Sequence, residues 1–295
     1  MDRTTDVAGA VSRIDPGSTV ATGLALEHAV PFAAGHELVR QRIGDLTLVG
    51  PISDVLFDQL VGCGLVSRIR AAWVGNVSAG SGYNFRRALE NDRIAVENHS
   101  NLSVALALEA AAMGVPYLPT RSLLGSDIVT EGPFRTTRDP FEGDRIVQVP
   151  AIAPDWAIVH VQRAAPSGDA HLWGNTGVTF EAVRAAEHVL LTAEEVVDPD
   201  VITSDPNRVR ITRDQVDCVA EVPLGAHPSP VAGCYDRDND FFLEYADRTR
   251  EPGGFEAWAE EWIHGVTDRA EYRDRIDPDL RVSEPTTAAE VTYGQ

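Results

Sequence analysis

Residues 93–120 read RIAVENHSNLSVALALEAAAMGVPYLPT and contain a complete strand–helix–strand unit. The short apolar run Ile94–Val96 predicts a strand, and Tyr117–Pro119 predicts a second one. Between them, Ser100–Met113 has the length and spacing of a helix, and Gly114 follows as a stop signal. A strand joined through a helix to the next strand is the building unit of α/β proteins, in which helices cover a parallel or mixed sheet.

The same alternation of apolar runs and helical patterns continues on both sides of this unit. Further strands are predicted at Thr19–Thr22, Leu46–Val49, Arg68–Val74, Ile146–Pro150, Trp156–Val161, Val189–Ala193 and Val219–Pro223. Further helices are predicted at Pro31–Arg42, Ser53–Val61, Tyr83–Glu90, Val178–Glu187 and Phe255–His264. The polar stretch 133–144 is expected to be an excursion between two strands. We therefore predict an α/β domain over residues 1–265, with an open, mostly parallel sheet covered by helices. A helical C-terminal extension over 266–295 should end in a loosely held tail from about Ile276.

The charge balance of the 295-residue chain excludes several classes of protein. The chain contains 45 acidic and 25 basic residues, every basic residue is arginine, and the net charge is −20. Without lysine, the chain cannot supply the phosphate-binding lysine of a P-loop or the amine of a Schiff-base enzyme. It has no basic face for phosphates, so we expect no nucleic-acid partner. An acidic surface without lysine is typical of proteins from a salt-rich, halophilic cytoplasm, where salt screens the self-repulsion.

Nothing in the sequence predicts a membrane segment, a disulfide framework or a metal site. No apolar run reaches the length of about 18 residues that a membrane span needs, and the first residues lack a signal-like apolar core. We therefore predict a cytoplasmic protein without a membrane partner. The three cysteines lie at wide spacings that form no metal knuckle. Residues 236–247 imitate a calcium loop, but Phe241 stands where that loop needs glycine, so we expect no metal.

Small or polar residues follow five of the predicted strands and define the candidate site. In an open α/β sheet, ligands bind at the carboxyl ends of the strands. A glycine-rich segment at such a place can present N–H groups and serine hydroxyls to an anion, and a plain flexible connection is the alternative. The five segments are Gly23–Ala25, Gly75–Gly82, Glu97–His99, Leu124–Asp127 and Gly225–Ser229.

Two of these segments hold side chains with more than one possible role. Glu97, beside His99, is a covalent nucleophile, a polar group that lines the site, or a structural carboxylate near a helix N-terminus, where the dipole favours it. His227 either contributes a polar group to the site or is a hydrogen-bonded structural histidine.

Five blocks of the sequence resemble the α subunit of class I coenzyme A transferases, most closely the glutaconate CoA-transferase branch. The likeness runs from about residue 15 to residue 275. It implies the fold of that family, in which an α and a β subunit of similar fold pair and hold the active site between them. The blocks are DPGSTVATG (15–23), VPFAAGHELVRQRIGDLTLVG (30–50), MGVPYLPTRSLLGSD (113–127), HVQRAAPSGDAHLWG (160–174) and LGAHPSPVAGCYDRDNDFF (224–242).

The resemblance also implies a division of labour between the two chains. A β-subunit glutamate attacks the acyl-CoA thioester, and CoA is then held as a glutamyl thioester until a carboxylic acid collects it. No catalytic nucleophile is therefore expected in this chain, and CoA is a substrate here and no permanently bound cofactor. Arg86, Arg121 and Arg163 are candidates for binding the second carboxylate of a dicarboxylic acceptor. The residues expected to bind substrate or CoA, or to stabilise the oxyanion, are Gly23, Leu24, Asn76, Ser78, Ser81, Glu97, Asn98, Asn101, Gly125, Ser126 and His227.

One position departs from the family pattern. The family's Gly-Gly-Phe signature is matched here by Gly23-Leu24-Ala25, where Leu24 keeps a backbone N–H but adds a side chain where glycine gives close approach. The added side chain is expected to affect either the transfer activity itself or the size of the acyl group that the site accepts. Two other functions are compatible with the residues: ring-opening hydrolysis of an acyl-CoA by the same fold, and non-catalytic binding of a sugar phosphate or effector. The absence of a DNA-binding segment counts against the second.

Overall fold

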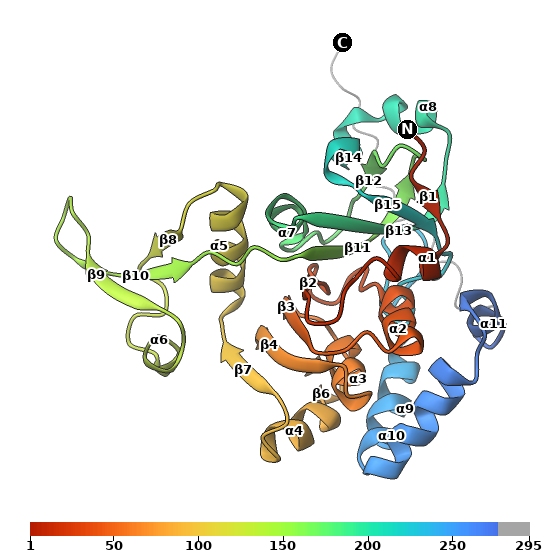
Figure 1. Cartoon of the computed structure of the whole chain (residues 1–295), viewed down its shortest axis with the longest axis horizontal. Helices are drawn as coiled ribbons and strands as arrows, with labels where there is room; N and C mark the ends of the chain where they lie inside the picture. Colours follow the sequence, from red (N-terminus) through yellow and green to blue (C-terminus); the bar gives the residue numbers. More distant parts are fainter. Residues whose placement is uncertain (277–295) are drawn as a thin grey trace.

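A mostly parallel sheet with helices on both faces forms the centre of the molecule (Figure 1). The computed structural model describes residues 1–276, and within them ten strands make up this sheet. Eight parallel strands form its main path, and β12 (Ala170–His171) and β14 (Val209–Ile211) join it antiparallel. The main path runs β1 (Thr4–Thr5), β15 (Cys218–Glu221), β13 (His188–Val196), β11 (Trp156–Ala164), β2 (Thr19–Ala21), β3 (Leu46–Ile52), β4 (Val66–Trp73) and β7 (Ala95–Asn98). The predicted fold class is confirmed.

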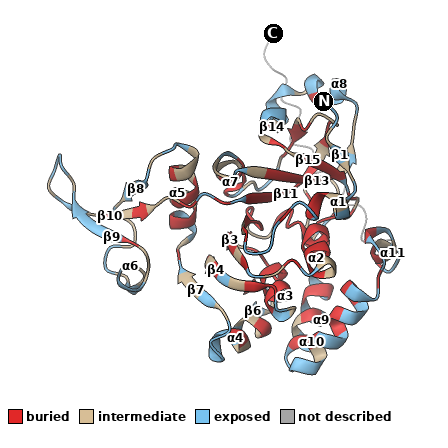
Figure 2. Cartoon of the chain, viewed as in Figure 1, coloured by how far each residue is buried: buried red, intermediate tan, exposed pale blue. Residues whose placement is uncertain are grey.

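Helices cover both faces because successive strand residues point to opposite sides. Val20 and Leu48 belong to the core cluster under α1 (Val7–Val11), α2 (Phe32–Gln41) and α3 (Leu56–Gly62). Their neighbours Ala21 and Val49 belong to the cluster under α5 (Asn101–Ala112) and α7 (Thr179–Ala185). Figure 2 shows that buried residues make up most of the central strands β11 and β13.

The C-terminal helices pack on the first of these faces. They are α9 (Asn239–Thr249), α10 (Pro252–Ala259), the π-helical turn η3 (Glu260–His264) and α11 (Arg269–Asp274). Their aromatic side chains Tyr245, Trp258 and Tyr272 are almost completely buried in the cluster that also contains α2 and α3. Asp58 of α3 fixes the contact, because its buried carboxylate accepts a 2.6 Å hydrogen bond from the Tyr245 hydroxyl. The predicted helical C-terminal region is thus present.

The order of the strands reverses between β2 and β11. From β2 the chain adds β3, β4 and β7 on one side, and from β11 it adds β13 and β15 on the other. Val20 of β2 lies opposite Trp156 of β11 in register. In doubly wound sheets, the carboxyl edge at such a reversal is the place where ligands bind.

A second, three-stranded sheet projects from the body and corrects one prediction (Figure 1). The strands predicted at Tyr117–Pro119 and Ile146–Pro150 exist as β8 (Tyr117–Thr120) and β10 (Arg145–Pro150), but they lie outside the main sheet. They pair antiparallel with each other, and β9 (Arg135–Arg138), inside the predicted polar excursion, adds a third strand. A short apolar run predicts a strand but does not specify its sheet. We call residues 116–152, which include α6 (Asp127–Glu131), the arm.

The remaining elements are short, and the sequence patterns identified few of them. The longest element missed is α9, because its start, DRDND, has the composition of a loop. The predicted tail from Ile276 lies beyond residue 276, outside the described residues. None of the described helices is long and apolar enough to cross a membrane. The short elements are β5 (Gly75–Asn76), β6 (Gly80–Ser81), α4 (Tyr83–Glu90), α8 (Pro199–Ser204), η1 (Pro206–Arg208) and η2 (Arg213–Gln215); α4 has the predicted bounds.

Candidate active site at the carboxyl edge of the sheet

Gly23, two residues after the end of β2, is packed against Ser53, the residue that follows β3. Its φ of +65° lies in the left-handed region, and a Cβ built on it would stand 2.4 Å from the Ser53 Cβ and 2.6 Å from the Ser53 Cα. Both the conformation and the close approach require glycine at this position. The edge formed by the ends of β2 and β3 is therefore fixed by close backbone packing.

Leu24 continues this edge with its backbone and fills the core with its side chain. The side chain is 4% exposed and belongs to the cluster under α5 and α7. The Leu24 carbonyl accepts a 2.9 Å hydrogen bond from the Val178 N–H, whereas the N–H groups of Gly23 and Leu24 donate to no other described residue. Free N–H groups at a strand end are the donors that an oxyanion needs.

A buried charged cluster joins the loops that follow β2, β3 and β4. Asp54 is completely buried, and its carboxylate accepts a 2.8 Å bond from Arg237 Nη1 and a 2.6 Å bond from Asn76 Nδ2. Arg237 also lies 3.6 Å from Glu27 and stacks on Phe242. Burial raises the pKa of Asp54 to about 6, and the nearby Arg237 charge and the Asn76 hydrogen bond oppose the rise.

The glycine-rich loop 75–82 folds into a tight hairpin of β5 and β6. Asn76 shapes it, because its side-chain oxygen accepts from the N–H groups of Ser78 and Ala79 at 2.8 and 3.0 Å. Asn76 is buried, so its side chain supports the loop and Asp54. Ser78 is exposed and Ser81 is half-buried.

Glu97 is the third residue of β7, and its carboxylate is held from two sides. Oε1 lies 3.2 Å from Arg70 Nε and 3.3 Å from His99 Nε2, and the side chain is 17% exposed. The hydrogen bond with His99, aided by the Arg70 charge and opposed by partial burial, lowers the pKa of Glu97 from its ordinary value. The group is therefore an ionised, immobilised carboxylate at the edge.

Asn98 and Asn101 flank the start of α5 and are both exposed near Glu97. Ser100 caps the helix, because its hydroxyl accepts from the Ser103 N–H at 3.0 Å and the Ser103 hydroxyl accepts from the Ser100 N–H. This cap fixes the turn between β7 and α5, on which the two asparagines are presented.

Of the five predicted strand-end segments, one lies outside the main sheet and another carries a buried histidine. Gly125 and Ser126 belong to the turn between β8 and α6 in the arm, since β8 is not a strand of the main sheet. His227 is completely buried, with Nδ1 2.9 Å from the Tyr272 hydroxyl and Nε2 3.0 Å from Asp238. It ties the segment after β15 to α9 and α11. The segment after β15 lies beside the segment after β2, where the Ala29 N–H donates to the Pro230 carbonyl at 2.9 Å. Four of the five segments thus follow parallel strands of the main sheet, and the arm segment lies outside it.

The structure adds two buried carboxylates that the sequence analysis did not select. Asp54 was not selected because the predicted helix began at Ser53 and included it. In the structure α3 begins at Leu56, so Asp54 lies in the loop before the helix. Glu194 of β13 lies 2.6 Å from His160 Nε2 and accepts from the Tyr235 hydroxyl at 2.7 Å. Burial alone would raise the pKa of Glu194, but the His160 and Tyr235 hydrogen bonds outweigh it and lower the pKa. His160 and Gly23 line the same small cavity.

The three arginines considered for a second carboxylate already have partners. Arg121 pairs with Glu142 and Asp144 in the arm, Arg163 pairs with Glu195, and Arg86 stacks on Tyr83. Residues 1–276 contain no group of three or more histidine, cysteine, aspartate or glutamate side chains arranged to hold a metal ion.

These features define a doubly wound α/β protein with a polar edge where the strand order reverses. Comparison with known proteins identifies the family: the sequence model of Coenzyme A transferase matches residues 4–221, and the chain belongs to that family. It is 34% identical to the A subunit of 3-oxoadipate CoA-transferase from Pseudomonas knackmussii, over 89% of this chain and 94% of that protein. It is 31% identical to the A subunit of glutaconate CoA-transferase from Acidaminococcus fermentans, covering 89% and 88% of the two chains.

The fold agrees with the family. A crystal structure of glutaconate coenzyme A-transferase from Acidaminococcus fermentans matches with a TM-score of 0.89 and 29% identity, over 95% of this chain and 96% of that chain. The similarity therefore includes the C-terminal helices, which lie beyond residue 221.

Proposed function

We propose that this chain is the α subunit of a heteromeric CoA-transferase that moves CoA between a short acyl-CoA and a free carboxylic acid. The observation that carries the proposal is the match along nearly the whole chain to the corresponding subunits of two such enzymes. A chain of this kind needs a β subunit to complete the site.

The carboxylates of the strand-end edge support a nucleophile supplied by that partner. Glu97 is held by Arg70 and His99, and Asp54 is buried against Arg237. An attacking carboxylate must reach the thioester carbon with a free oxygen. Asp54 is completely buried with both oxygens hydrogen-bonded, and Glu97, although its Oε2 has no partner among the described residues, is fixed through Oε1 by two cationic or donor side chains.

In the proposed reaction, the partner's glutamate attacks the acyl-CoA carbonyl and displaces the CoA thiolate, which leaves an acyl-glutamyl anhydride. The thiolate then attacks the glutamyl carbonyl, forming the glutamyl-CoA thioester and releasing the donor carboxylate. The acceptor carboxylate repeats the two steps in reverse, so that the new acyl-CoA forms and the glutamate is freed.

This chain contributes N–H donors and a fixed electrostatic environment to that chemistry. The free N–H groups of Gly23 and Leu24 are suited to the oxyanion of a tetrahedral intermediate, where one such donor is worth about 10²–10³ in rate. Asn98 and Asn101 are exposed at the same edge and suited to contact CoA or the acyl group.

The test reconstitutes the enzyme from this chain and the β-subunit homologue of the same organism. We expect no transfer by this chain alone and full transfer by the pair. Borohydride added with acyl-CoA should reduce a glutamyl thioester on the β chain, and a reduced residue in this chain would overturn the assignment. Sustained CoA release without an acceptor acid would instead identify a hydrolase, and tight binding of a sugar phosphate without response to CoA esters would identify a sensor.

Replacing Glu97 with glutamine should leave the transferase within about ten-fold of wild-type activity. The amide keeps the hydrogen bond to His99 but loses the charge that pairs with Arg70, so the free energy of unfolding should fall by about 1 kcal/mol. Steady-state assays of the reconstituted pair and urea unfolding measure the two quantities. Activity at the level of the enzyme-free blank would make Glu97 the nucleophile.

A further inference from the structure

The arm has one face in the core and one apolar face in solvent. The register places Val147 and Val149 on the inner face, where both are completely buried. Residues offset by one point outward: Tyr117 and Pro119 of β8, with Ile146 and Gln148 of β10. The solvent face of an antiparallel sheet is normally polar. This one carries aromatic, proline and isoleucine side chains.

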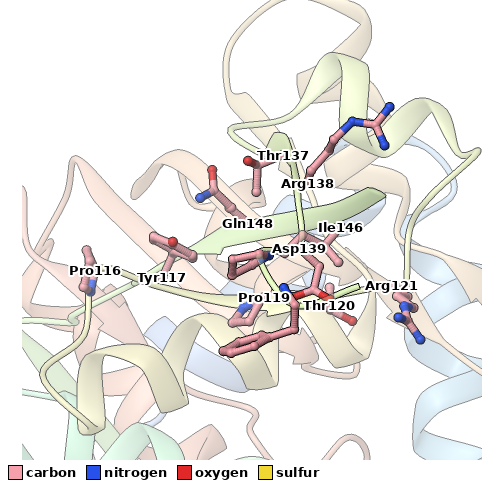
Figure 3. A pocket seen from close by; sticks show the side chains of 12 residues that line it. Pro116, Tyr117, Pro119, Thr120, Arg121, Thr137, Arg138, Asp139, Ile146 and Gln148 are labelled. Atoms are coloured by element: carbon pink, nitrogen blue, oxygen red, sulfur yellow. The ribbon is translucent and has the colours of Figure 1, made fainter. Parts of the chain in front are cut away.

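A cavity of about 820 Å³ opens over this outer face. Figure 3 shows Tyr117, Pro119, Ile146 and Gln148 lining it between the strands. Phe141, in the β9–β10 turn beside the cavity, is 94% exposed. An exposed phenylalanine beside an apolar hollow indicates a surface that a partner covers.

The charge of the arm differs from that of the rest of the chain. Residues 116–152 hold four arginines and five acidic residues, so they carry only one of the chain's 20 net negative charges. Arg138 of β9 lies directly opposite Arg145 of β10 at the exposed end of the hairpin, in the register of Val147, and neither forms an ion pair with any described residue. Arg138 also lines the cavity. Like charges placed opposite each other in a sheet are destabilising, and an acidic side chain of a partner would relieve the repulsion.

We propose that the arm is a docking arm, and that its outer face binds an apolar segment of the β subunit flanked by acidic side chains. This inference rests on the proposed function. The β subunit is favoured because the arm is anchored beside the site: the buried Phe134, at the base of the arm, packs edge-on against the buried His99, which contacts Glu97. The chain's own C-terminal helices lie on the other side of the body (Figure 1).

The experiment compares association of the pair for wild type and two arm variants. In the first, Tyr117→Ser and Phe141→Ser remove aromatic rings from the outer face. In the second, Arg138→Glu and Arg145→Glu reverse the charge of the hairpin. Binding to the β subunit is measured by biolayer interferometry, and self-association of this chain alone by sedimentation. We expect binding at least ten-fold weaker in both variants, because aromatic and arginine side chains dominate interface energetics.

Matched controls lie on the body. Leu243→Ser removes an exposed apolar side chain from α9, and Arg13→Glu with Arg93→Glu reverses two exposed arginines. These variants should bind like wild type, and circular dichroism should show all of them folded. Unchanged binding by both arm variants overturns the docking arm, as does a loss of self-association without a loss of β-subunit binding. If wild type does not bind the β subunit, the proposed function fails instead.

Discussion

Gly23→Ala should remove nearly all transferase activity from the reconstituted enzyme, with a loss of at least 100-fold, and lower the free energy of unfolding by about 2–4 kcal/mol. The new Cβ would meet Ser53 at 2.4 Å from its Cβ and 2.6 Å from its Cα, and the second of these atoms is backbone. The residue would also stand at a φ of +65°, which costs about 1 kcal/mol or more for alanine. Relief requires the ends of β2 and β3 to separate, which moves the N–H groups of Gly23 and Leu24.

Gly64→Ala is the matched control for this prediction. Gly64 has a φ of +73°, but a Cβ there would have no atom within 4 Å. Its alanine variant therefore reports backbone strain alone, and we expect a cost of about 1 kcal/mol with unchanged activity. Adding Ser53→Gly to the Gly23→Ala variant removes the clash with the Ser53 side chain but not the clash with the backbone, so rescue should be partial. Equal behaviour of Gly23→Ala and Gly64→Ala in unfolding and activity would contradict the argument from close packing.

The sequence predicted the main sheet well because the periodicity of buried segments is a local property. The helix α4 has its predicted bounds, and β2, β3, β11 and β13 begin within one residue of their predicted starts. The arm was not predicted as a separate sheet. Val147 and Val149 pack in the same core cluster as α5. The alternation of apolar and polar residues predicts a strand there, but it does not indicate which sheet the strand joins.

The site was predicted in part for a similar reason. Gly23 and Glu97 could be found because they lie close to the ends of strands of the main sheet. Asp54 and Arg237, 183 residues apart, meet only through the fold. The sequence around His227 is typical of a loop. Its complete burial results from the packing of α9 and α11 over it, which the sequence does not reveal. Contacts between distant segments therefore account for most of what the sequence could not reveal.

Asp54→Asn should lower the free energy of unfolding by only about 1 kcal/mol at pH 7, because the cost of burying the Asp54 charge offsets most of the value of its pair with Arg237. Asp54 accepts hydrogen bonds from both Arg237 and Asn76, and the Asn76 oxygen is already occupied by the loop 76–79. An amide at position 54 would direct N–H groups at one of these donors and leave Arg237 without its buried charged partner. Removing one member of a buried pair alone costs about 3–5 kcal/mol, and the relief of the buried Asp54 charge, together with Glu27 at 3.6 Å from Arg237, should recover most of it.

The pH dependence of the same variant decides whether burial or the ion pair dominates at Asp54. Because burial raises the pKa of Asp54 to about 6 from 3.8, the folded chain binds a proton that the unfolded chain has already released between about pH 4 and pH 6. Wild type should thus lose about 3 kcal/mol of stability from this group as the pH rises through that window, and nothing further above it. Asparagine does not titrate, so the stability gap between wild type and Asp54→Asn, measured by urea unfolding at each pH, should narrow from pH 4 to pH 6. A gap that instead widens as the pH rises toward 3.8 and then stays level up to pH 6 would mean that Arg237 holds the pKa of Asp54 below 3.8, and that the ion pair outweighs the cost of burial.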